Sequence, residues 1–271
     1  MSTRVVLLGS GAVRPVPGRD GPAQVVLADG EPLLFDCGRG AVTGLRRAGV
    51  PPETVNPAFL THLHFDHVSD LPYFILSTWV IGRDREAKVY GPLGTKDFLK
   101  KSVQEAYAED LRTRFGHGRS AFGLEADVTE VAEEGALVET SLYAVSAAPV
   151  VHADMQNLGY RVEAADGVVV VLGDVDRRQD LTEFVRGADV LLCECSGTEE
   201  FLSHPSRPWG AWHMRPTDVA ALAARAAVKK VVLKHFVMED EEAIARMGDA
   251  VREGFPGEVF VGGDGLEIVV S

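Results

Sequence analysis

Short apolar runs rich in β-branched residues recur along the chain and alternate with stretches of helical periodicity. The apolar runs predict strands at residues 5–8, 24–28, 32–36, 58–61, 88–90, 142–146, 159–163, 168–172, 190–193, 231–234, 259–261 and 266–270. The helical pattern predicts helices at residues 40–48, 71–81, 95–111, 181–185, 216–227 and 239–253. The first strands precede any long helix, whereas the later strands alternate with helices. This order favours an α/β fold of the α+β type, with two packed sheets flanked by helices, over a regular doubly wound sheet.

The length and apolar content of the chain determine how much core it can form. Its 271 residues are 46% hydrophobic and 25% charged, which is enough apolar material for a substantial core. Because no segment rich in Pro, Gly or Ser is typical of a linker, we expect a single domain over residues 1–271 made of two packed αβ halves, roughly 1–140 and 141–271. Segment 116–135 is polar and interrupted by glycines, which predicts a surface loop or a lid.

Composition restricts the classes of partner and the compartment. The chain has 27 Lys and Arg against 40 Asp and Glu, a formal net charge of −13, which weighs against a long nucleic acid as partner. Three cysteines cannot form a disulfide framework and favour a reducing compartment. No apolar run approaches the ~18 residues that a membrane helix needs, and the first predicted strand starts too early to leave room for a signal peptide. We therefore expect a cytoplasmic protein with no membrane partner.

The strongest chemical signal is a cluster of histidines directly after the strand predicted at 58–61. Three imidazoles and one carboxylate occur within six residues: His62, His64, Asp66 and His67. Side chains alternate along an extended chain, so His62 and His64 share one side of it. The chain must then turn to present Asp66 and His67. Imidazole nitrogens and carboxylate oxygens are suitable ligands for Zn, Fe or Mn, so the pattern predicts a metal centre.

The run from His62 to His67 resembles the signature of the metallo-β-lactamase superfamily, whose members fold into a four-layer αβ/βα sandwich with a two-metal site at one edge. Further motifs are similar to the branch that contains ribonuclease Z, arylsulfatases and related phosphodiesterases. They are the glycine-rich turn at 9–11 with the prolines and arginine that follow it, the run 33–38 and the run 89–95. The likeness extends over most of the chain, except for the stretch from about 100 to 140.

This resemblance implies two divalent metal ions, zinc with manganese or iron as alternatives, and a complete set of ligands. It places one metal among His62, His64 and His152, the second among Asp66, His67 and His235, and Asp174 as a bridge between the two. The local sequence supports three of these assignments independently. His152, Asp174 and His235 each follow an apolar run that predicts a strand.

The residues expected to take part in catalysis are Asp66, His213 and Glu194. In the ribonuclease Z-like branch a histidine at the position of His213 contacts the scissile phosphate and assists catalysis, and the resemblance gives His213 this role. A glutamate at a strand end, here Glu194, would orient that histidine. The branch usually has threonine two residues after the histidine, whereas this chain has Arg215.

The chain departs from ribonuclease Z in ways that bear on its substrate. Ribonuclease Z carries a long arm, which grips precursor tRNA, between the strands that bear the counterparts of His152 and Asp174. Here these residues are only 22 positions apart, and the pattern between them predicts a hairpin. Phe65 and Asp70 also replace glycines that are usual near the signature. With the negative net charge, these departures favour a small substrate over tRNA.

Tryptophans and arginines close to the motifs are candidates for the substrate pocket. Trp209 and Trp212 shortly precede His213, and an aromatic or otherwise apolar leaving group would fit if Trp212 faces the metals. Arg19 and Arg215 are candidate anion contacts, because a guanidinium group offers two parallel donors.

These residues predict a dinuclear metal-dependent hydrolase, in which a hydroxide bridging the two metals attacks a small anionic ester. A phosphodiester ranks ahead of a sulfate ester as the substrate. The alternatives, in order, are an ester, thioester or lactone hydrolase, a ribonuclease Z-type tRNA 3′-processing endonuclease, and a non-catalytic binding protein. The expected partners are a small anionic substrate and, as in many relatives of this branch, a second copy in a homodimer. Neither nucleic acid nor a membrane is expected.

Overall fold

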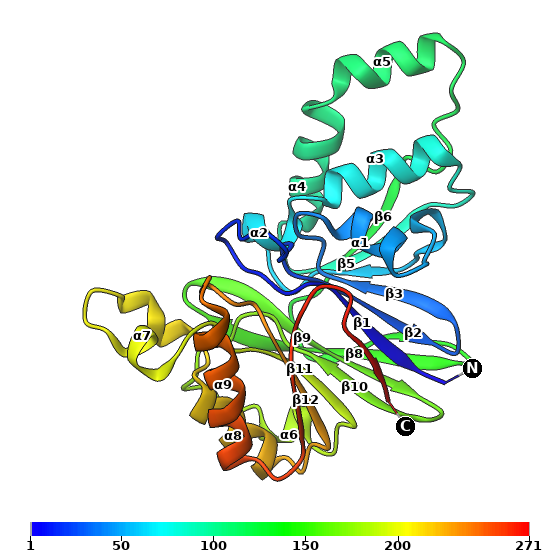
Figure 1. Ribbon diagram of the computed structural model, residues 1–271. Helices are drawn as coiled ribbons and strands as arrows, with labels where there is room; N and C mark the ends of the chain where they lie inside the picture. The colour runs from blue at the N-terminus through cyan, green and yellow to red at the C-terminus, as the bar shows by residue number, and fades with distance from the viewer. Residues whose placement is uncertain (1, 271) are drawn as a thin grey trace.

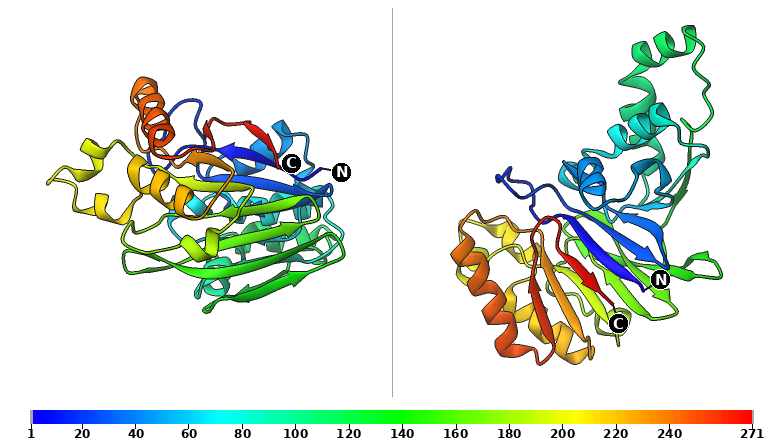
Figure 2. Two further views of the ribbon diagram at one scale, coloured as in Figure 1. Left: turned by 90° about the horizontal axis from the view of Figure 1, so that it is seen from below. Right: turned by 45° about the vertical axis from the view of Figure 1, so that its right-hand side comes forward.

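Two seven-stranded β-sheets pack face to face in the computed structural model, which describes residues 2–270 (Figure 1). Helices cover the outer face of each sheet, so that the molecule has four layers (Figure 2). This arrangement confirms the predicted α/β sandwich of two sheets flanked by helices.

The first sheet combines an antiparallel and a parallel part. Its strands, in spatial order, are β14 (Glu267–Val269), β1 (Arg4–Gly9), β2 (Ala23–Ala28), β3 (Glu31–Phe35), β4 (Ala58–Phe59), β5 (Ala87–Gly91) and β6 (Ala126–Glu130). The pairs from β14 to β3 are antiparallel, and the pairs from β3 to β6 are parallel. Parallel strands direct their carboxyl ends to one edge of a sheet, which is where ligand sites form in α/β folds.

The second sheet repeats this plan. Its strands, in spatial order, are β13 (Glu258–Val261), β12 (Lys230–Lys234), β11 (Val190–Glu194), β10 (Gly167–Val171), β9 (Met155–Ala164), β8 (Tyr143–His152) and β7 (Gly135–Glu139). The pairs from β7 to β10 are antiparallel and those from β10 to β13 are parallel. Short turns join β8 to β9 and β9 to β10, so the gap between His152 and Asp174 holds only a hairpin, as predicted.

Most helices lie on the outer faces of the two sheets. They are α1 (Ala41–Arg47), α2 (Phe65–Val68), α3 (Leu71–Ile81), α4 (Thr95–Leu99), α5 (Ala108–Gly116), α6 (Thr182–Val185), α7 (Glu199–Ser203), α8 (Pro216–Arg225) and α9 (Glu241–Gly254), with 3₁₀ segments η1 (Pro52–Thr54) and η3 (Pro208–Trp212) and a π-helical segment η2 (Lys100–Glu105). Helices α1 and α3 cover the first sheet, and α8 and α9 cover the second (Figure 1). Among the described residues, none of the helices has the length and apolar character needed to cross a membrane.

The chain crosses between the two sheets twice. The chain passes from the first sheet to the second between β6 and β7, and strand β14 returns to the first sheet beside β1. Backbone hydrogen bonds extend this contact, for example from the amide of Val270 to the carbonyl of Thr3 at 3.0 Å. The first sheet is therefore completed only by the last strand of the chain.

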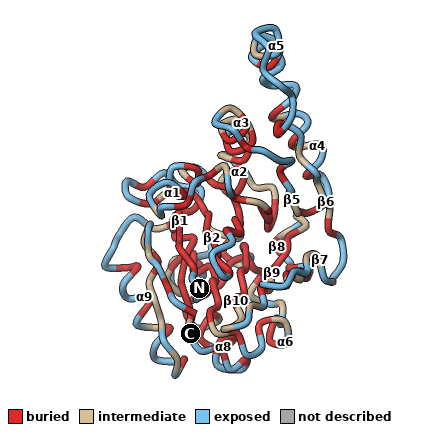
Figure 3. Tube along the Cα trace, turned by 90° about the vertical axis from the view of Figure 1, so that its right-hand side faces the viewer, coloured by how far each residue is buried: buried red, intermediate tan, exposed pale blue. Residues whose placement is uncertain are grey.

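Burial on both faces explains why the central strands read as continuous apolar runs. Along β12, Val231 and Leu233 pack against the helices of the second sheet, whereas Val232 packs between the two sheets. A strand buried on both sides has no polar face and loses the alternation of a half-exposed strand. Figure 3 accordingly shows the strands of the sandwich as largely buried and the tip of α5 as exposed.

The largest difference from the predicted elements lies between residues 95 and 135. The helix predicted over 95–111 is divided into α4, η2 and α5, and α5 projects from the body of the molecule (Figure 1). Segment 116–135, predicted as a loop or lid, instead contains strand β6. This strand lies at the edge of its sheet and has the polar sequence Ala-Asp-Val-Thr-Glu. An edge strand tolerates polar residues on both faces, which removes the apolar signal.

Candidate active site

The predicted metal ligands meet at one edge of the sandwich, where strands of both sheets end. His62, His64, Asp66 and His67 follow β4, His152 ends β8, Asp174 follows β10, and His235 follows β12. The one-turn helix α2 supplies the turn that the sequence required after the first two histidines. The structure brings all seven side chains into groups whose ligand atoms lie within 4.8 Å of one another.

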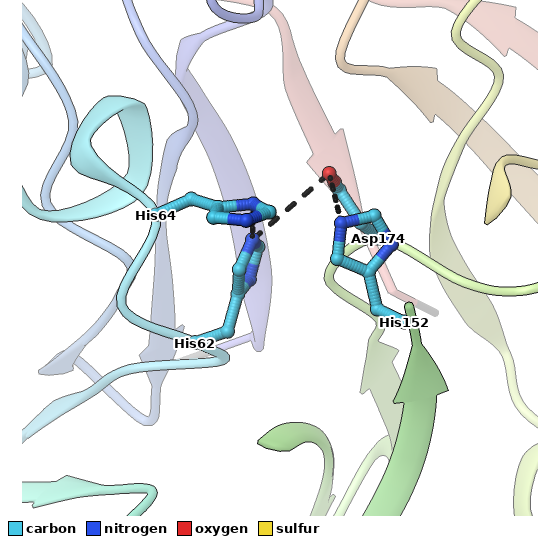
Figure 4. A group of neighbouring side chains, drawn as sticks. All are labelled: His62, His64, His152 and Asp174. Atoms are coloured by element: carbon cyan, nitrogen blue, oxygen red, sulfur yellow. Dashed lines mark hydrogen bonds and ion pairs between the residues drawn. The ribbon is translucent and has the colours of Figure 1, made fainter. Parts of the chain in front are cut away.

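Asp174 lies at the centre and faces two clusters of nitrogen atoms. Its Oδ2 atom is 3.6 Å from Nε2 of His152 and 4.0 Å from Nε2 of His62. Figure 4 shows this side of the carboxylate, with the three labelled histidines around it. Its Oδ1 atom is 3.2 Å from Nε2 of His235 and 3.4 Å from Nε2 of His67. One carboxylate therefore faces both clusters, and the family resemblance gives Asp174 the place of a bridging ligand.

Three buried atoms at this centre have no hydrogen-bond partner among the described residues: Nε2 of His67, Nε2 of His235 and Oδ1 of Asp174. Buried polar atoms are nearly always paired, because an unpaired one costs free energy. These three converge on the same space, and they are imidazole nitrogens and a carboxylate oxygen. Such a donor set fits a divalent cation and gives the unpaired atoms a partner. The side chains therefore form metal-binding His/Asp clusters.

Asp36 is a further functional residue that was not among those predicted. It follows β3, is fully buried and accepts a hydrogen bond from the amide of Thr61 at 2.8 Å. Its Oδ2 atom is 2.9 Å from Nδ1 of His67, so it orients that ring and leaves Nε2 for a cation. The sequence did contain a signal, since Asp36 ends an apolar run in the same way as Asp174.

The rings of His235 and His152 are also oriented by a contact to the nitrogen that faces away from the metal position. Nδ1 of His235 is 3.0 Å from the hydroxyl of Ser196, and Nδ1 of His152 is 3.2 Å from the carbonyl oxygen of Trp212. Contacts of this kind determine which nitrogen of a histidine is presented to a metal. No sequence pattern indicated these partners, because one is a lone serine and the other a backbone atom.

The charges around Asp174 favour the protonated form of His67, whereas burial lowers the pKa of His62 and His64. Burial lowers the pKa of His67, but the charges of Asp36 and Asp174 outweigh burial and raise it to about 10. Burial raises the pKa of Asp174, yet the charges of His235 and His67 hold that pKa well below its ordinary value. Carboxylates that stay ionised and an imidazole that keeps its proton define a space where a cation is stabilised. Metal binding would displace the proton from the imidazole.

His213 and Glu194 form a buried pair next to these clusters. Nδ1 of His213 is 2.8 Å from Oε2 of Glu194, which ends β11 and also accepts a hydrogen bond from the amide of Val175 at 2.6 Å. Burial lowers the pKa of His213, but the charge and the hydrogen bond of Glu194 outweigh burial and raise it to about 9. The Glu194 carboxylate thus favours the protonated form of the ring. Because Nδ1 contacts Glu194, Nε2 is the nitrogen available to the site.

A cavity of about 360 Å³ opens over these side chains. His213 lines it, whereas the fully buried Glu194 does not, so Glu194 acts on the site through His213. Trp209 and Trp212 both line the cavity. This is the condition under which the sequence predicted a pocket for an apolar or aromatic leaving group.

The two predicted anion contacts are wrong. Arg19 is buried, lies over the ring of Phe236 and pairs with Glu241 at 2.8 Å. Arg215 pairs with Asp218 at 2.7 Å at the start of α8. Neither arginine lines the cavity, since each guanidinium is taken by an acidic partner that its position in the sequence did not reveal.

The backbone at Gly38, shortly after β3, lies very close to the loop that carries Asp66, and this contact yields a stability prediction. A Cβ atom added at Gly38 would lie 2.2 Å from the carbonyl oxygen of Asp66. We expect Gly38→Ala to lower the free energy of unfolding by about 2–3 kcal/mol, because the loop that carries Asp66 must move. Chemical denaturation measures this. Gly135→Ala, where an added Cβ has nothing within 4 Å, is the matched control, and equal stability of the two variants would contradict the prediction.

Comparison with known proteins agrees with this geometry. Residues 32–236 match the model of the Beta-lactamase superfamily domain. The chain is 30% identical over 240 residues to ribonuclease Z of Mycolicibacterium paratuberculosis (strain ATCC BAA-968 / K-10), which covers 86% of this chain and 85% of that protein. It is 28% identical over 240 residues to ribonuclease Z of Mycobacterium marinum (strain ATCC BAA-535 / M), with 86% of each chain covered.

Solved structures share the fold at lower sequence identity. The metallo-β-lactamase fold protein YhfI from Bacillus subtilis has a TM-score of 0.76 at 17% identity, and the short form of human tRNase Z has a TM-score of 0.76 at 23% identity; each comparison covers 99% of both chains. A diphosphatase from the PhnP family has a TM-score of 0.70 at 19% identity, over 98% of this chain and 97% of that one.

The chain belongs to the β-lactamase superfamily and has the metallo-β-lactamase fold. Its relatives within that superfamily include ribonuclease Z sequences, as the motifs indicated, and the protein is a metal-dependent hydrolase.

Proposed function

We propose that this hydrolase uses two divalent metal ions to cleave a small phosphodiester. The observation that carries the proposal is the position of Asp174, whose two oxygen atoms face separate clusters of histidine nitrogens. A carboxylate shared in this way suits a pair of cations better than a single one.

The side chains around Asp174 divide into two ligand sets. His62, His64 and His152 would hold one ion, and Asp66, His67 and His235 the other, with Asp174 between them. Imidazole with one or two carboxylates suits zinc, and manganese or iron are alternatives with the same ligands. When bound, two such ions supply a water molecule of lowered pKa and offset negative charge on the reacting group.

His213 would donate a proton to the leaving group. Hydrolysis adds the oxygen of water to phosphorus and breaks one P–O ester bond, so the leaving oxygen requires a proton. The protonated His213 ring carries one, and Glu194 contacts Nδ1 at 2.8 Å, which leaves Nε2 available to the leaving group. A group with a pKa above neutrality, near the reacting atoms, suits a general acid. A phosphate monoester and an alcohol or phenol would leave the site.

The size and the mainly apolar walls of the cavity support a small substrate. Its volume of about 360 Å³ lies at the lower end of ligand pockets, and its walls are mainly apolar. A phosphodiester ranks ahead of a sulfate ester, because the similar proteins include a ribonuclease and a diphosphatase, and both names denote cleavage of a bond to phosphorus. A carboxylic ester, thioester or lactone is the next alternative.

Precursor tRNA is the second candidate substrate, favoured by the identity of 28–30% to ribonuclease Z proteins. Against it stand the net charge of −13 and the plain hairpin between His152 and Asp174, where ribonuclease Z carries its tRNA-gripping arm. The cytoplasmic location and the homodimer expected from the sequence stay predictions.

Removal of metal tests the proposed function. We expect the chelated, dialysed protein to hydrolyse bis(p-nitrophenyl) phosphate at less than ~1% of its initial rate, and about two equivalents of zinc to restore the rate, since the ligand sets require two ions. The metal should also raise Tm, because it binds only the folded state. Full turnover by protein that contains no metal would refute the proposal. Cleavage of precursor tRNA with a higher kcat/KM than the diester would instead favour the endonuclease.

A further inference from the structure

We propose that the cavity recognises an aromatic ring on a singly charged phosphodiester, with Phe65 and Trp212 as the residues that determine this specificity. The inference rests on the proposed function and extends it to the class of substrate. It starts from an observation that metal chemistry does not explain: the side chains that rim the ligand clusters are mostly apolar and aromatic.

Phe65 and Trp212 are large apolar side chains that remain exposed beside the metal ligands. Phe65 is 67% exposed and Trp212 is 38% exposed, and both line the cavity. Phe65 begins α2 in the first half of the fold, whereas Trp212 ends η3 in the second. Exposed apolar surface at the mouth of a pocket marks a binding surface, because a ligand removes it from water. A ligand that touches both residues covers both halves of the sandwich.

The aromatic wall continues inward to the proposed proton donor. The ring of Phe201 meets that of Trp209 edge-on, with centroids 6.1 Å apart, and Trp209 meets His213 edge-on, with centroids 5.7 Å apart. Trp209 therefore packs between Phe201 and His213 in this wall of the cavity. An aromatic ring of the substrate gains both apolar burial and edge or face contacts there.

Phe65 lies between two proposed metal ligands, His64 and Asp66. Its exposed ring lines the cavity, where it offers a contact to a small aromatic group.

The charge of the cavity limits the substrate to few negative charges. Among the described residues that line it, Arg14 is the one arginine or lysine, and it already pairs with Glu239 at 2.8 Å. A chain of phosphates needs a row of cationic side chains, which this wall lacks. A diester with one charge on phosphorus needs only the metal centre. The substrate class is thus an aryl or heteroaryl phosphodiester.

Two probes that differ only in the ring test this inference. Methyl methylphosphonate and methyl phenylphosphonate each carry one negative charge, and their inhibition constants against bis(p-nitrophenyl) phosphate hydrolysis can be compared in the zinc-loaded protein. We expect the phenyl compound to bind about tenfold more tightly, the equivalent of one buried ring contact. Its binding should also change the tryptophan fluorescence, because Trp209 and Trp212 line the cavity.

Variants show which residues create this preference. We expect Trp212→Ala and Phe65→Gly each to reduce the tenfold ratio of the two inhibition constants to below about threefold. Trp212→Ala keeps the backbone carbonyl that contacts His152, and Phe65→Gly serves if that variant fails to fold. Phe122→Ala is the matched control, because Phe122 is 65% exposed but does not line the cavity.

The outcomes separate this inference from the proposed function. Equal inhibition by the two probes, or an unchanged ratio in both variants, would overturn the aromatic site while diester hydrolysis stands. Absence of diester hydrolysis would overturn the proposed function, and fluorescence titration with the two probes would then test the ring preference directly. Tighter binding of an RNA oligonucleotide than of the phenyl probe would also overturn the inference.

Discussion

Asp174→Asn is expected to lower kcat/KM for a phosphodiester by at least about 10³-fold and to leave the protein with fewer than two metal ions per chain. Asparagine has the shape of aspartate but no charge, and the two carboxylate oxygens of Asp174 serve both ligand clusters. Loss of one charge therefore weakens both metal positions together. Metal analysis and kinetics on the same preparation measure the effect.

A second measurement does not depend on turnover. Zinc should raise the Tm of the original protein by several degrees and that of Asp174→Asn by much less, because the stabilisation follows the affinity of the folded state for the metal. Asp154→Asn is the matched control, since Asp154 is exposed in the turn after β8. A variant at Asp174 that retained two ions and full activity would contradict the bridging position.

The second large effect is expected at His213. His213→Ala should reduce kcat for a diester with a poor leaving group by about 10²–10³-fold, the usual contribution of a general acid. The loss should be much smaller for p-nitrophenolate, which leaves without a proton. His213 is not in the proposed ligand sets, so the metal content should be unchanged. An equal loss for both leaving groups would refute its role as a proton donor.

The pair with Glu194 gives this prediction a pH dependence. The carboxylate raises the pKa of His213 to about 9, so His213 is protonated below that pH and loses the proton above it. Without the charge, in Glu194→Gln, the pKa of His213 falls, and the alkaline decline in activity should begin at lower pH. Glu200→Gln, at an exposed position of α7, is the control and should keep the original profile.

Much of the site could be predicted because its residues follow strands. An apolar run that ends in His or Asp is visible in a sequence, and this pattern supported the positions of His152, Asp174 and His235 that the family resemblance implied. The partners behind them could not be located in the same way. Ser196 and the backbone of Trp212 contact ligand rings only because β11, β12 and η3 end side by side, which is a property of the tertiary structure.

The elements and contacts that the sequence did not predict correctly have a similar physical explanation. Buried parallel strands have strong apolar runs and were predicted well, whereas β6 was missed because an edge strand carries little apolar signal. Arg19 and Arg215 were misassigned because both are consumed by acidic side chains, Glu241 and Asp218, that the sequence does not mark as neighbours. Pairing of charged side chains depends on tertiary packing rather than on local sequence pattern.

The return of β14 to the first sheet has a consequence for biosynthesis. Strand β1 pairs with both β2 and β14, so its outer edge stays open while some 260 later residues are made, until Glu267–Val269 arrive. A nascent chain therefore presents an unpaired strand edge, which is a hazard for aggregation, and contacts this distant in sequence slow folding. The first sheet is therefore complete only when Arg4–Gly9 and Glu267–Val269, which lie far apart in sequence, have paired.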